Sequence, residues 1–378
     1  MTTPIRIGVA GLGAVAQTVH LPLLARRPDL FEISAVAEIS PSTRDRVAAR
    51  YGVPAARRVV SSADLIALGD LDALMILTSG SHGADTLAAV QVGLPVFCEK
   101  PLAYSVSEAR ALVDAVTDRP MVQVAYMKQY DPASAALAGL VTGLDDVRAV
   151  DVQVLHPSDA SQLAFASLPP RPTDADPELL AALVAATDSV VHAAIGRSGD
   201  AHARLYTNIV LGSIVHDVSL LRGMFGSPER IDLVRRYAGE PGSVEVLATL
   251  PGDIPLSLTW HYIPDYPAYR ETVMIHHGTG SAGVAFPCPY LLNAPSELHV
   301  VGNVDGAESR AITRSVREEF EIELEGFAAM VRDGVPPRSG PAEGLADIVT
   351  GQRIYARYAE TYKVALAGEA AGSEGGDG

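Results

Sequence analysis

The sequence predicts an α/β protein with two domains: a doubly wound parallel sheet at the N-terminus, then an α+β domain with a large, mostly antiparallel open sheet. Apolar runs alternate with helical patterns over residues 1–127, a glycine-rich turn follows the first apolar run, and strand patterns cluster between residues 230 and 301. The length of 378 residues also suits two domains better than one. We therefore expect domains at residues 1–127 and 128–366, and a disordered tail at 367–378.

The elements of the first domain follow from apolar runs and helix-capping signals. Strands are expected at residues 4–11, 31–38, 71–79, 95–100 and 121–127, and helices at 14–27, 40–52, 82–93 and from 105 onward. Ser40 with Pro41 supplies an N-cap and a first-turn proline, and Ser105 with Glu108 forms a capping box. Strands that alternate with helices of this length form right-handed βαβ units, which build a parallel sheet.

The second domain is expected to begin with a strand at residues 146–157. A proline- and alanine-rich segment with helical stretches follows at 157–200, and then a helix at 207–226. Strands joined by tight turns fill residues 230–301. Two helices are expected at 315–333 and 342–366, and the second could pack back on the first domain.

Composition and charge narrow the functional classes. The net charge of −16 argues against sequence-independent binding to nucleic acid or to an anionic membrane, which relies on basic patches. Cys98 and Cys288 form no disulfide framework and no metal-ligand spacing, which fits a reducing compartment. No apolar stretch is expected to be long enough to span a bilayer, and the N-terminal residues do not resemble a signal peptide. We expect a cytoplasmic protein without a metal site.

A phosphate-binding turn is predicted between the first strand and the first helix, where the sequence contains Gly11-x-Gly13-x-x-Ala16. The first glycine allows the tight turn, the second lets a pyrophosphate approach the backbone, and the small third residue lets helix and strand pack closely. The N-terminus of the helix supplies N–H groups for the phosphates. The alternative is a merely tight turn. The residues expected to bind a dinucleotide here are Gly11, Leu12, Gly13, Ala14, Val15 and Ala16.

Glu38, at the end of the second strand, bears on the choice of cofactor. A carboxylate at this spacing after the glycine turn accepts hydrogen bonds from the ribose hydroxyls of NAD and repels the 2′-phosphate of NADP. Ile39 follows it in the same loop, and Arg44 lies near enough to counter that repulsion. We expect NAD as the cofactor, with NADP as the alternative.

The segment "FCEKPLA" places Glu99 and Lys100 at the carboxyl end of a strand, where open α/β sheets bind their ligands. A lysine that is partly desolvated there could have a lowered pKa and exchange a proton with a substrate hydroxyl. Glu99 could pair with this lysine or bind the nicotinamide ribose. The alternative is a surface Glu–Lys pair at a strand end.

These motifs, in this order, resemble the Gfo/Idh/MocA family (glucose–fructose oxidoreductase, inositol dehydrogenase and rhizopine catabolism). The resemblance rests on the glycine turn, Glu38, "CEKPLA" and "VAYMKQYDPA", and it continues with "HDVSLLRGMFG" and "GFAAMVRDGVPP". It implies a Rossmann domain plus an α/β domain whose open sheet carries the substrate pocket and often an oligomer interface. It also implies NAD(P)-dependent chemistry on sugars, cyclitols and related alcohols.

The resemblance assigns roles around the expected nicotinamide. Lys100 is similar to the family's catalytic lysine and Glu99 to the residue near the nicotinamide ribose, and the Lys100–Pro101 bond is often cis in the family. Thr78, Ser79 and His82 occupy a segment where relatives touch the cofactor. The common "TPN" wording is absent there. His82 could equally be a polar residue at a helix start.

Two further residues are assigned from the "MKQYDPA" segment. Lys128 stands where relatives commonly have arginine, and we expect it among the cofactor-binding residues. Tyr130 is expected at the entrance to the substrate pocket.

In the second domain, His216 resembles the family's active-site histidine, which assists the lysine or binds the reacting oxygen. Asn208, Gly212 and His216 recur four residues apart, which predicts that they share one helical face. Many polyol-oxidising relatives carry an aspartate where this chain has Gly212, and an acidic residue where it has Ser219. Asn208 or Asp217 could substitute, and we expect both to bind substrate.

Residues 259–271, "TWHYIPDYPAYRE", combine aromatic and polar side chains. They could stack against a sugar, with Tyr262 as a substrate contact. They could equally fill a subunit interface.

The expected function is an NAD(P)-dependent oxidoreductase that transfers a hydride between nicotinamide and a hydroxyl- or keto-bearing carbon of a sugar, sugar derivative or cyclitol. Two alternatives remain. One is a glycoside-processing enzyme that works through a transient keto-sugar, and the other is a catalytically impaired sensor or scaffold that still binds the nucleotide. The resemblance also implies a homodimer or homotetramer assembled through the C-terminal sheet.

Overall fold

The computed structural model describes residues 3–237, 239 and 242–375. The chain forms two compact units, and each is composed of three segments. The first unit contains Met1–Tyr126, Ala166–Ala193 and Phe320–Ile348, and the second contains Met127–Phe165, Ala194–Glu319 and Val349–Gly378. The chain first passes from one unit to the other near the expected boundary at residue 127. Two later segments of the chain also belong to the first unit.

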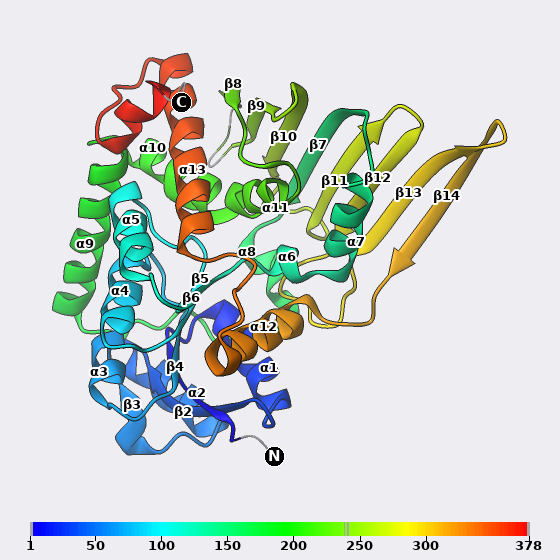
Figure 1. The fold of residues 1–378 in the computed structure, drawn as a ribbon. Coiled ribbons are helices and arrows are strands. Elements are labelled where there is room, and N and C mark those ends of the chain that lie inside the picture. Colours follow the sequence, from blue (N-terminus) through cyan, green and yellow to red (C-terminus); the bar gives the residue numbers. More distant parts are fainter. Residues whose placement is uncertain (1–2, 238, 240–241, 376–378) are drawn as a thin grey trace. The chain divides into compact units, whose positions relative to one another are not determined.

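A six-stranded parallel sheet organises the first unit, with the strand order β3-β2-β1-β4-β5-β6 (Figure 1). This is the order of the doubly wound dinucleotide-binding fold, so the predicted Rossmann class is confirmed. The strands are β1 (Ile5–Ala10), β2 (Phe31–Ala37), β3 (Arg58–Val59), β4 (Ala73–Ile76), β5 (Val96–Glu99) and β6 (Val122–Ala125). Strands β4 and β6 are buried at every residue, which is why their sequences are continuously apolar or nearly so.

Helices follow the strands of this sheet, as the alternating pattern predicts. The first of them begins with a π-helical turn, where the sequence predicted a regular helix. The helices are η1 (Ala16–His20), α1 (Leu21–Arg26), α2 (Pro41–Arg50), η2 (Ala55–Arg57), α3 (Ser62–Ala67), α4 (Gly83–Gln91) and α5 (Val106–Ala115), joined by most of α9 (Pro177–Ile195), by α12 (Glu319–Asp333) and by the start of α13 (Pro341–Tyr362).

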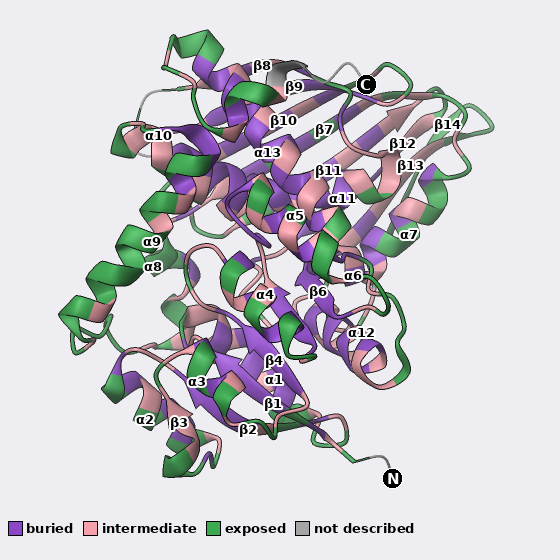
Figure 2. Cartoon of the chain, turned by 60° about the vertical axis from the view of Figure 1, so that its left-hand side comes forward, coloured by how far each residue is buried: buried purple, intermediate pink, exposed green. Residues whose placement is uncertain are grey.

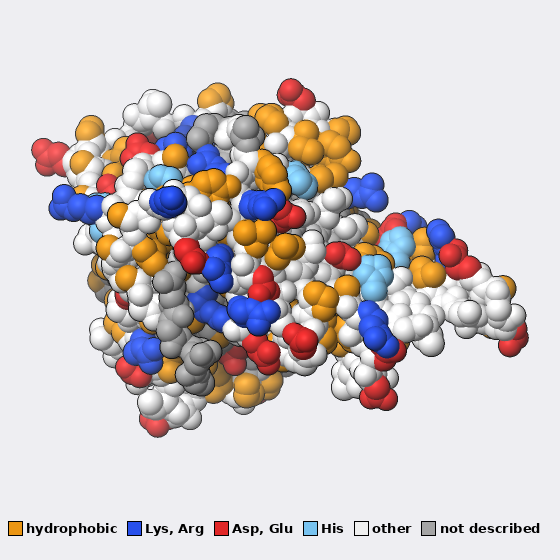
Figure 3. Space-filling model, turned by 90° about the horizontal axis from the view of Figure 1, so that it is seen from above, with side chains coloured by type: hydrophobic (Ala, Val, Ile, Leu, Met, Phe, Trp, Pro, Cys, Tyr) orange, Lys and Arg blue, Asp and Glu red, His pale blue; other side chains and the backbone are white. Residues whose placement is uncertain are grey.

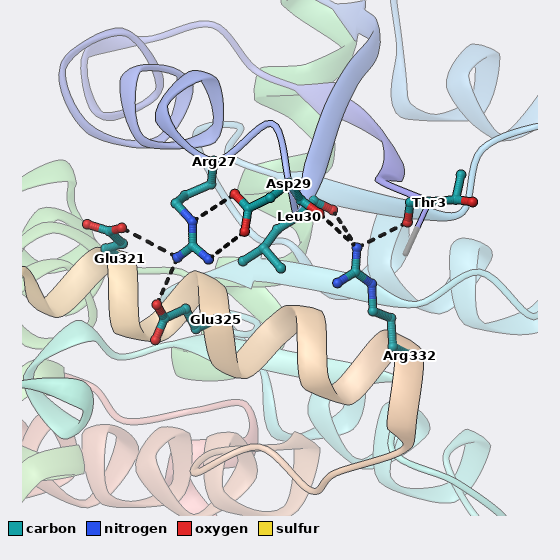
Figure 4. Close-up of polar contacts among 7 residues, drawn as sticks. All are labelled: Thr3, Arg27, Asp29, Leu30, Glu321, Glu325 and Arg332. Carbon is teal, nitrogen blue, oxygen red and sulfur yellow. Dashed lines mark hydrogen bonds and ion pairs between the residues drawn. The ribbon is translucent and has the colours of Figure 1, made fainter. Parts of the chain in front are cut away.

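Helix α12 belongs to the first unit because its side chains bond to the chain just before β2. Two arginines make these contacts (Figure 4): Arg27 pairs with Asp29, Glu321 and Glu325, and Arg332 donates to the carbonyl oxygens of Thr3, Asp29 and Leu30. On the apolar side of the helix, Phe327 packs edge-on against Phe97 of β5, with ring centroids 5.5 Å apart. The polar contacts between α12 and the chain just before β2 link residues about 300 positions apart, so no local sequence pattern could indicate them.

Helix α9 corrects one expectation. With 19 residues and a mean hydropathy of 1.5, it is long and apolar enough to cross a membrane by length and composition alone. The sequence did not suggest this because Glu178, Asp188 and His192 interrupt an alanine-rich run whose apolarity is modest at each residue. Most of the helix is exposed (Figure 2). One such helix does not by itself indicate a membrane protein.

An eight-stranded sheet organises the second unit, with the order β14-β13-β12-β11-β7-β10-β9-β8 (Figure 1). Only β7 and β10 run parallel, so the prediction of a large, mostly antiparallel sheet is confirmed. The strands are β7 (Val147–His156), β8 (Arg230–Arg236), β9 (Val244–Leu250), β10 (Ile254–Tyr262), β11 (Arg270–His277), β12 (Gly280–Phe286), β13 (Glu297–Val304) and β14 (Ala307–Arg314). Strand β14 was not predicted, because all eight of its residues are exposed and show no apolar alternation.

One face of this sheet is buried and the other is open. Along β7, Val150, Val152 and Val154 are buried, whereas the residues between them are exposed. The helices of this unit are α6 (Met127–Tyr130), α7 (Pro132–Val141), α8 (Asp159–Gln162), η3 (Ala164–Ala166), α10 (Asp200–Arg204), η4 (Leu205–Ile214), α11 (Val215–Phe225), the end of α13 and η5 (Glu369–Gly375).

Two of these helices differ from the sequence expectations. The single helix expected at 207–226 is a π-helix over Leu205–Ile214 that continues as α11. Residues Glu369–Gly375, within the tail expected to be disordered, form a short helix in which Ala370 is fully buried. Residues 376–378 of that tail lie outside the described residues.

Candidate functional site

The glycine turn after β1 has one glycine that the fold requires and one that leaves room for a ligand. Gly11 has φ +87°, and a Cβ there would lie 2.7 Å from the backbone of Leu77 and Thr78. Only glycine tolerates both the conformation and this close approach. A Cβ at Gly13, in contrast, would meet no protein atom within 4 Å. The open side of Gly13 is therefore where a pyrophosphate can approach the backbone at the start of the helix.

This contrast predicts different outcomes for two alanine substitutions. Gly11→Ala should lower the melting temperature, because the new methyl group meets backbone atoms that cannot move aside. Gly13→Ala should leave the melting temperature unchanged but weaken dinucleotide binding about tenfold or more, since one methyl group fills the approach to the phosphates. Thermal unfolding and titration with NADH, measured for both variants, test the pair. Equal loss of stability in both would contradict this description of the turn.

Glu38 follows β2 and lies against the glycine turn. Its Oε2 accepts a hydrogen bond from the Leu12 amide at 2.9 Å, and its Oε1 accepts one from the Ser40 amide at 3.0 Å. The Arg44 guanidinium donates to the backbone carbonyl of Glu38 at 3.0 Å. A carboxylate oxygen can accept more than one hydrogen bond, so Glu38 keeps acceptor capacity for ribose hydroxyls. Ile39, the next residue, is half-buried. The turn, the carboxylate and the open side of Gly13 fit an NAD-type dinucleotide.

Glu99 is fixed by two hydrogen bonds at the carboxyl end of β5. Its Oε1 lies 3.0 Å from His20 Nε2, and its Oε2 accepts from the Lys100 amide at 3.0 Å. Burial raises the pKa of Glu99, but the hydrogen bond and charge of His20, together with the charge of Lys100, outweigh that effect and leave the pKa lowered. Glu99 therefore stays ionised beside Lys100. The Lys100–Pro101 peptide bond is cis, as the resemblance implied.

His82 connects the loops that follow β4 and β5. Its Nδ1 lies 2.7 Å from the Pro101 carbonyl oxygen and its Nε2 lies 2.8 Å from that of Thr78. These two contacts fix the orientation of the ring between the two loops. His82 is also the N-cap residue of α4, which agrees with the alternative of a polar residue at a helix start, although its side chain makes no capping hydrogen bond. Ser79, in the loop after β4, is exposed.

Glu323 of α12 is a buried carboxyl group near Glu99 that the sequence did not indicate. It is fully buried, and within the described part of the chain neither of its carboxyl oxygens has a hydrogen-bond partner. Burial, reinforced by the charge of Glu99, raises its pKa well above the usual range. The folded protein thus holds a neutral Glu323, because ionising it would place a second charge beside Glu99 in an apolar setting.

Replacing Glu323 with methionine should stabilise the protein increasingly as the pH rises. Because the pKa is raised on folding, the proton that Glu323 holds favours the folded state below the unfolded pKa, and this contribution is lost as the pH rises through the folded pKa. Methionine does not titrate, so the melting temperature of the variant should exceed that of wild type by a margin that widens with pH. Glu321→Met, a half-buried position on the same helix, serves as control. A margin independent of pH would contradict the raised pKa.

In the second unit, the π-helix η4 changes the expected arrangement around His216. The shared-face prediction assumed α-helical spacing, but η4 bonds i→i+5 and so does not align residues four apart. Asn208 is exposed, whereas Gly212 and His216 are half-buried. A Cβ at Gly212 would lie 3.1 Å from the Thr207 carbonyl oxygen, so this turn leaves little room for the aspartate that many relatives carry there.

A buried cluster of charges lies next to His216 in the chain. The Lys128 amine is 2.8 Å from Asp217 Oδ1 and also pairs with Glu271 of β11. Tyr269 donates to the other Glu271 oxygen at 2.5 Å, and the Lys128 amine lies over the Phe286 ring at 5.1 Å from its centroid. Lys128 is 4% exposed and Asp217 is 1% exposed. These contacts anchor α6 and α11 to the sheet.

The cluster contains one amine and two carboxyl groups, so its net charge is not zero when all three groups are ionised. Burial and the charge of Glu271 raise the pKa of Asp217 well above its usual range. Burial alone would raise the pKa of Glu271 too, but the Lys128 charge and hydrogen bonds from Asp217, Lys128 and Tyr269 lower it. Lys128 loses charge stabilisation by burial, yet the two carboxyl groups raise its pKa. The cluster thus holds Lys128 and Glu271 as an ion pair and a protonated Asp217.

In the aromatic segment expected near the substrate, the tryptophan is buried and the tyrosines are half-buried. Trp260 is 3% exposed, and its Nε1 donates to Ser213 Oγ of η4 at 2.9 Å. Tyr262 is half-buried and stacks on Trp260, with ring centroids 6.3 Å apart and planes 13° apart. Tyr130 is buried in the same unit.

The structure brings most residues predicted in the first unit to one edge of its sheet. The glycine turn, Glu38, Thr78, His82, Glu99 and Lys100 all stand at or just after the carboxyl ends of β1, β2, β4 and β5. His216, Asp217, Lys128, Tyr130, Asn208 and Tyr262 belong to the second unit. The sequence missed the roles of His20, Glu323, Tyr269 and Glu271. His20 and Glu271 have ionic partners that are distant in the chain. Among the residues that the structure describes, no group of three or more metal-ligating side chains could hold a metal.

Sequence similarity to known proteins is concentrated in the N-terminal part of the chain. Residues 5–126 match the model of the Gfo/Idh/MocA oxidoreductase family, described as an NAD-binding Rossmann fold. An inositol 2-dehydrogenase of Saccharopolyspora erythraea is 38% identical over 140 residues, which are 36% of this chain and 40% of that protein. The match thus spans well under two thirds of the relative's length. The resemblance seen in the sequence is confirmed over residues 5–126, which match the family's NAD-binding Rossmann fold.

Two solved structures match nearly the whole chain. A UDP-N-acetylglucosamine 3-dehydrogenase from Acidithiobacillus ferrooxidans has a TM-score of 0.67 and 19% identity, covering 94% of this chain and 98% of its own. A 3-ketoreductase from Actinomadura kijaniata, solved with TDP-benzene and NADP, has a TM-score of 0.67 and 17% identity, covering 91% and 95%. At these identities the likeness establishes the fold of both units and not the activity.

Proposed function

We propose that this chain, whose residues 5–126 belong to the Gfo/Idh/MocA family, is an NAD(P)-dependent oxidoreductase acting on a hydroxyl or keto carbon of a sugar, sugar derivative or cyclitol. The main support for this proposal is the position of Lys100. It follows β5 directly, beside an ionised Glu99, at the same sheet edge as the glycine turn and Glu38. The inositol 2-dehydrogenase match makes cyclitols the first substrates to test.

The residues of the first unit have distinct roles in this proposal. When bound, the nicotinamide exchanges the hydride with the substrate carbon. The open side of Gly13 admits the pyrophosphate, and Glu38 accepts hydrogen bonds from the adenosine ribose, with Ile39 and Arg44 beside it. Lys100 takes the hydroxyl proton during oxidation and returns it during reduction. His20 and Glu99 hold the lysine's backbone in place, and His82 connects the loops that carry Thr78, Ser79 and Pro101.

Residues of the second unit are proposed to bind the substrate. His216 keeps the role that the resemblance implies, with Asn208, Tyr130 and Tyr262 as further substrate contacts. Asp217 and Lys128 are given a positioning role instead, because their contacts with each other and with Glu271 are buried.

The sensor alternative has one observation in its favour. Neither position that is acidic in many polyol-oxidising relatives carries an acid here, and Ser219, at one of them, is buried and accepts a hydrogen bond from Gln129 at 2.6 Å. The glycoside-processing alternative would use the same residues without net change in the cofactor.

Absorbance at the nicotinamide band tests the proposal. NAD or NADP with a panel of cyclitols and sugars should give a substrate-dependent increase, or keto-sugars with the reduced cofactor a decrease. Tight binding of NADH without turnover of any substrate would favour the sensor. Product formation without change in absorbance would favour glycoside processing.

We also propose that copies of the chain associate through the open face of the eight-stranded sheet. The half-exposed side chains Thr259, Thr272, Met274 and His276 lie on this face. Light scattering after size-exclusion chromatography would give the oligomeric state.

On the surface seen in Figure 3, basic and acidic side chains are interspersed, which does not favour a nucleic-acid partner. Two free, buried cysteines fit the expected cytoplasmic location.

A further inference from the structure

Asp174 comes from the segment Ala166–Ala193, outside the matched Rossmann residues, yet it binds the loop after Glu38. Its Oδ1 accepts from Ser40 Oγ at 2.6 Å, and its Oδ2 accepts from the Ser42 amide at 2.8 Å. Ser40 also donates its amide to Glu38. Two carboxylates from distant parts of the chain thus flank one serine, at the N-terminus of the ten-residue helix α2.

The hydrogen bonds keep the Asp174 charge in place. The Ser40 hydroxyl and the Ser42 amide and hydroxyl lower the pKa of Asp174 to about 2, although the side chain is exposed. Asp174 is therefore ionised across the physiological range. Asp174 thus already uses the Ser40 hydroxyl and the Ser42 amide at the start of α2.

The rest of the segment follows the same sheet edge. Gly80, in the loop after β4, has φ +101°, and a Cβ there would lie 3.3 Å from Thr187 Oγ1 of α9. The segment that carries Asp174 therefore meets the loops after both β2 and β4. Ligands of open α/β sheets bind outside these carboxyl ends.

These contacts decide which adenosine ribose the loop can accept. In a Rossmann domain, the carboxylate after β2 bonds the ribose 2′-hydroxyl of NAD, and NADP places a doubly charged phosphate on that oxygen. The phosphate would need donors from the loop after β2 and a cation to balance it. Here Ser40 and Ser42 already donate to Asp174, and its charge adds to that of Glu38. Arg44, the nearby cation, already bonds the Glu38 carbonyl.

We infer that Asp174 is a specificity-determining residue that, with Glu38, selects NAD over NADP by occupying the donors that a 2′-phosphate would need. The inference rests on the proposed function only in requiring that the first unit binds a nicotinamide dinucleotide. It assigns cofactor selection to a residue of the segment between the two sheets.

Titration with NADH and NADPH, followed by nicotinamide fluorescence, tests the inference without any turnover. Wild type should bind NADH more tightly than NADPH. Asp174→Ala should tighten NADPH binding about tenfold or more, because it removes a like charge and frees the serine donors. Asp174→Asn removes the charge but keeps one acceptor oxygen, so it should tighten NADPH binding less. NADH affinity should change less than about twofold in both variants.

Asp176→Asn is the matched control. It makes the same charge change two residues away, but Asp176 accepts from the amides of Glu178 and Leu179 at the start of its own helix. Its ratio of NADPH to NADH affinity should equal that of wild type. An unchanged ratio in both Asp174 variants, or the same change in the Asp176 variant, would overturn the inference. Failure of wild type to bind either nucleotide would instead overturn the proposed function.

Discussion

Lys100→Ala should lower turnover by about 10²- to 10⁴-fold while the dissociation constant for NADH stays within about twofold of wild type. The reason is positional. Lys100 follows the last residue of β5 at the sheet edge where the nicotinamide is proposed to bind, and Glu99 beside it is held by His20 rather than by the lysine side chain alone. Losing the amine therefore removes the proton acceptor but not the phosphate- and ribose-binding residues.

Steady-state kinetics and a nucleotide titration on the same preparation separate these two effects. Lys363→Ala is the matched control, since this lysine is exposed just after α13 and should leave both constants unchanged. Activity of Lys100→Ala close to that of wild type would refute the proposed role of the lysine. A large loss of NADH affinity would show that the lysine serves binding instead.

Lys128→Met should destabilise the second unit by about 3–5 kcal/mol, because it leaves Glu271 ionised and buried without its cation. The loss should grow as the pH rises, since protonation of Glu271 at lower pH relieves the unpaired charge. Trp260 is the sole tryptophan and lies buried in the second unit. Its fluorescence during denaturant unfolding therefore reports on this unit directly.

The double variant Lys128→Met with Glu271→Gln provides the control for this prediction. It removes both charges and leaves Asp217, whose pKa is already raised, in its neutral form. Most of the lost stability should return, because neutral groups of similar size cost much less to bury than an unpaired charge. If Lys128→Met unfolds at the same denaturant concentration as wild type, the ion pair does not stabilise the unit.

The sequence was informative wherever function depends on local pattern. Gly11, Gly13, Glu38 and Lys100 each follow a strand of recognisable apolar pattern, so their common location at one sheet edge could be predicted from strand order alone. Likewise, the strand clusters were enough to predict the second sheet. Strand β14 could not be predicted, because its exposed residues carry no apolar alternation.

What the sequence did not indicate depends on contacts between distant residues. His20 and Glu99 are 79 positions apart, and Ser40 and Asp174 are 134 apart, so neither pair forms a motif. The π-helix around Gly212 was also missed, because its sequence is compatible with an ordinary helix and tertiary packing decides the hydrogen-bond pattern. The shared face of Asn208, Gly212 and His216 depended on that assumption.

Transfer of deuterium from substrate to the nicotinamide would demonstrate the proposed hydride transfer. Wild-type protein would be incubated with NAD and a panel of cyclitols and sugars that carry deuterium on their hydroxyl-bearing carbons, and the recovered nucleotide analysed by mass spectrometry and NMR. We expect NADH with deuterium at C4 of the nicotinamide from at least one substrate, and none when Lys100→Ala replaces wild type over the same time. NAD that stays unreduced with every member of the panel, or NADH that forms without deuterium, would contradict the proposal.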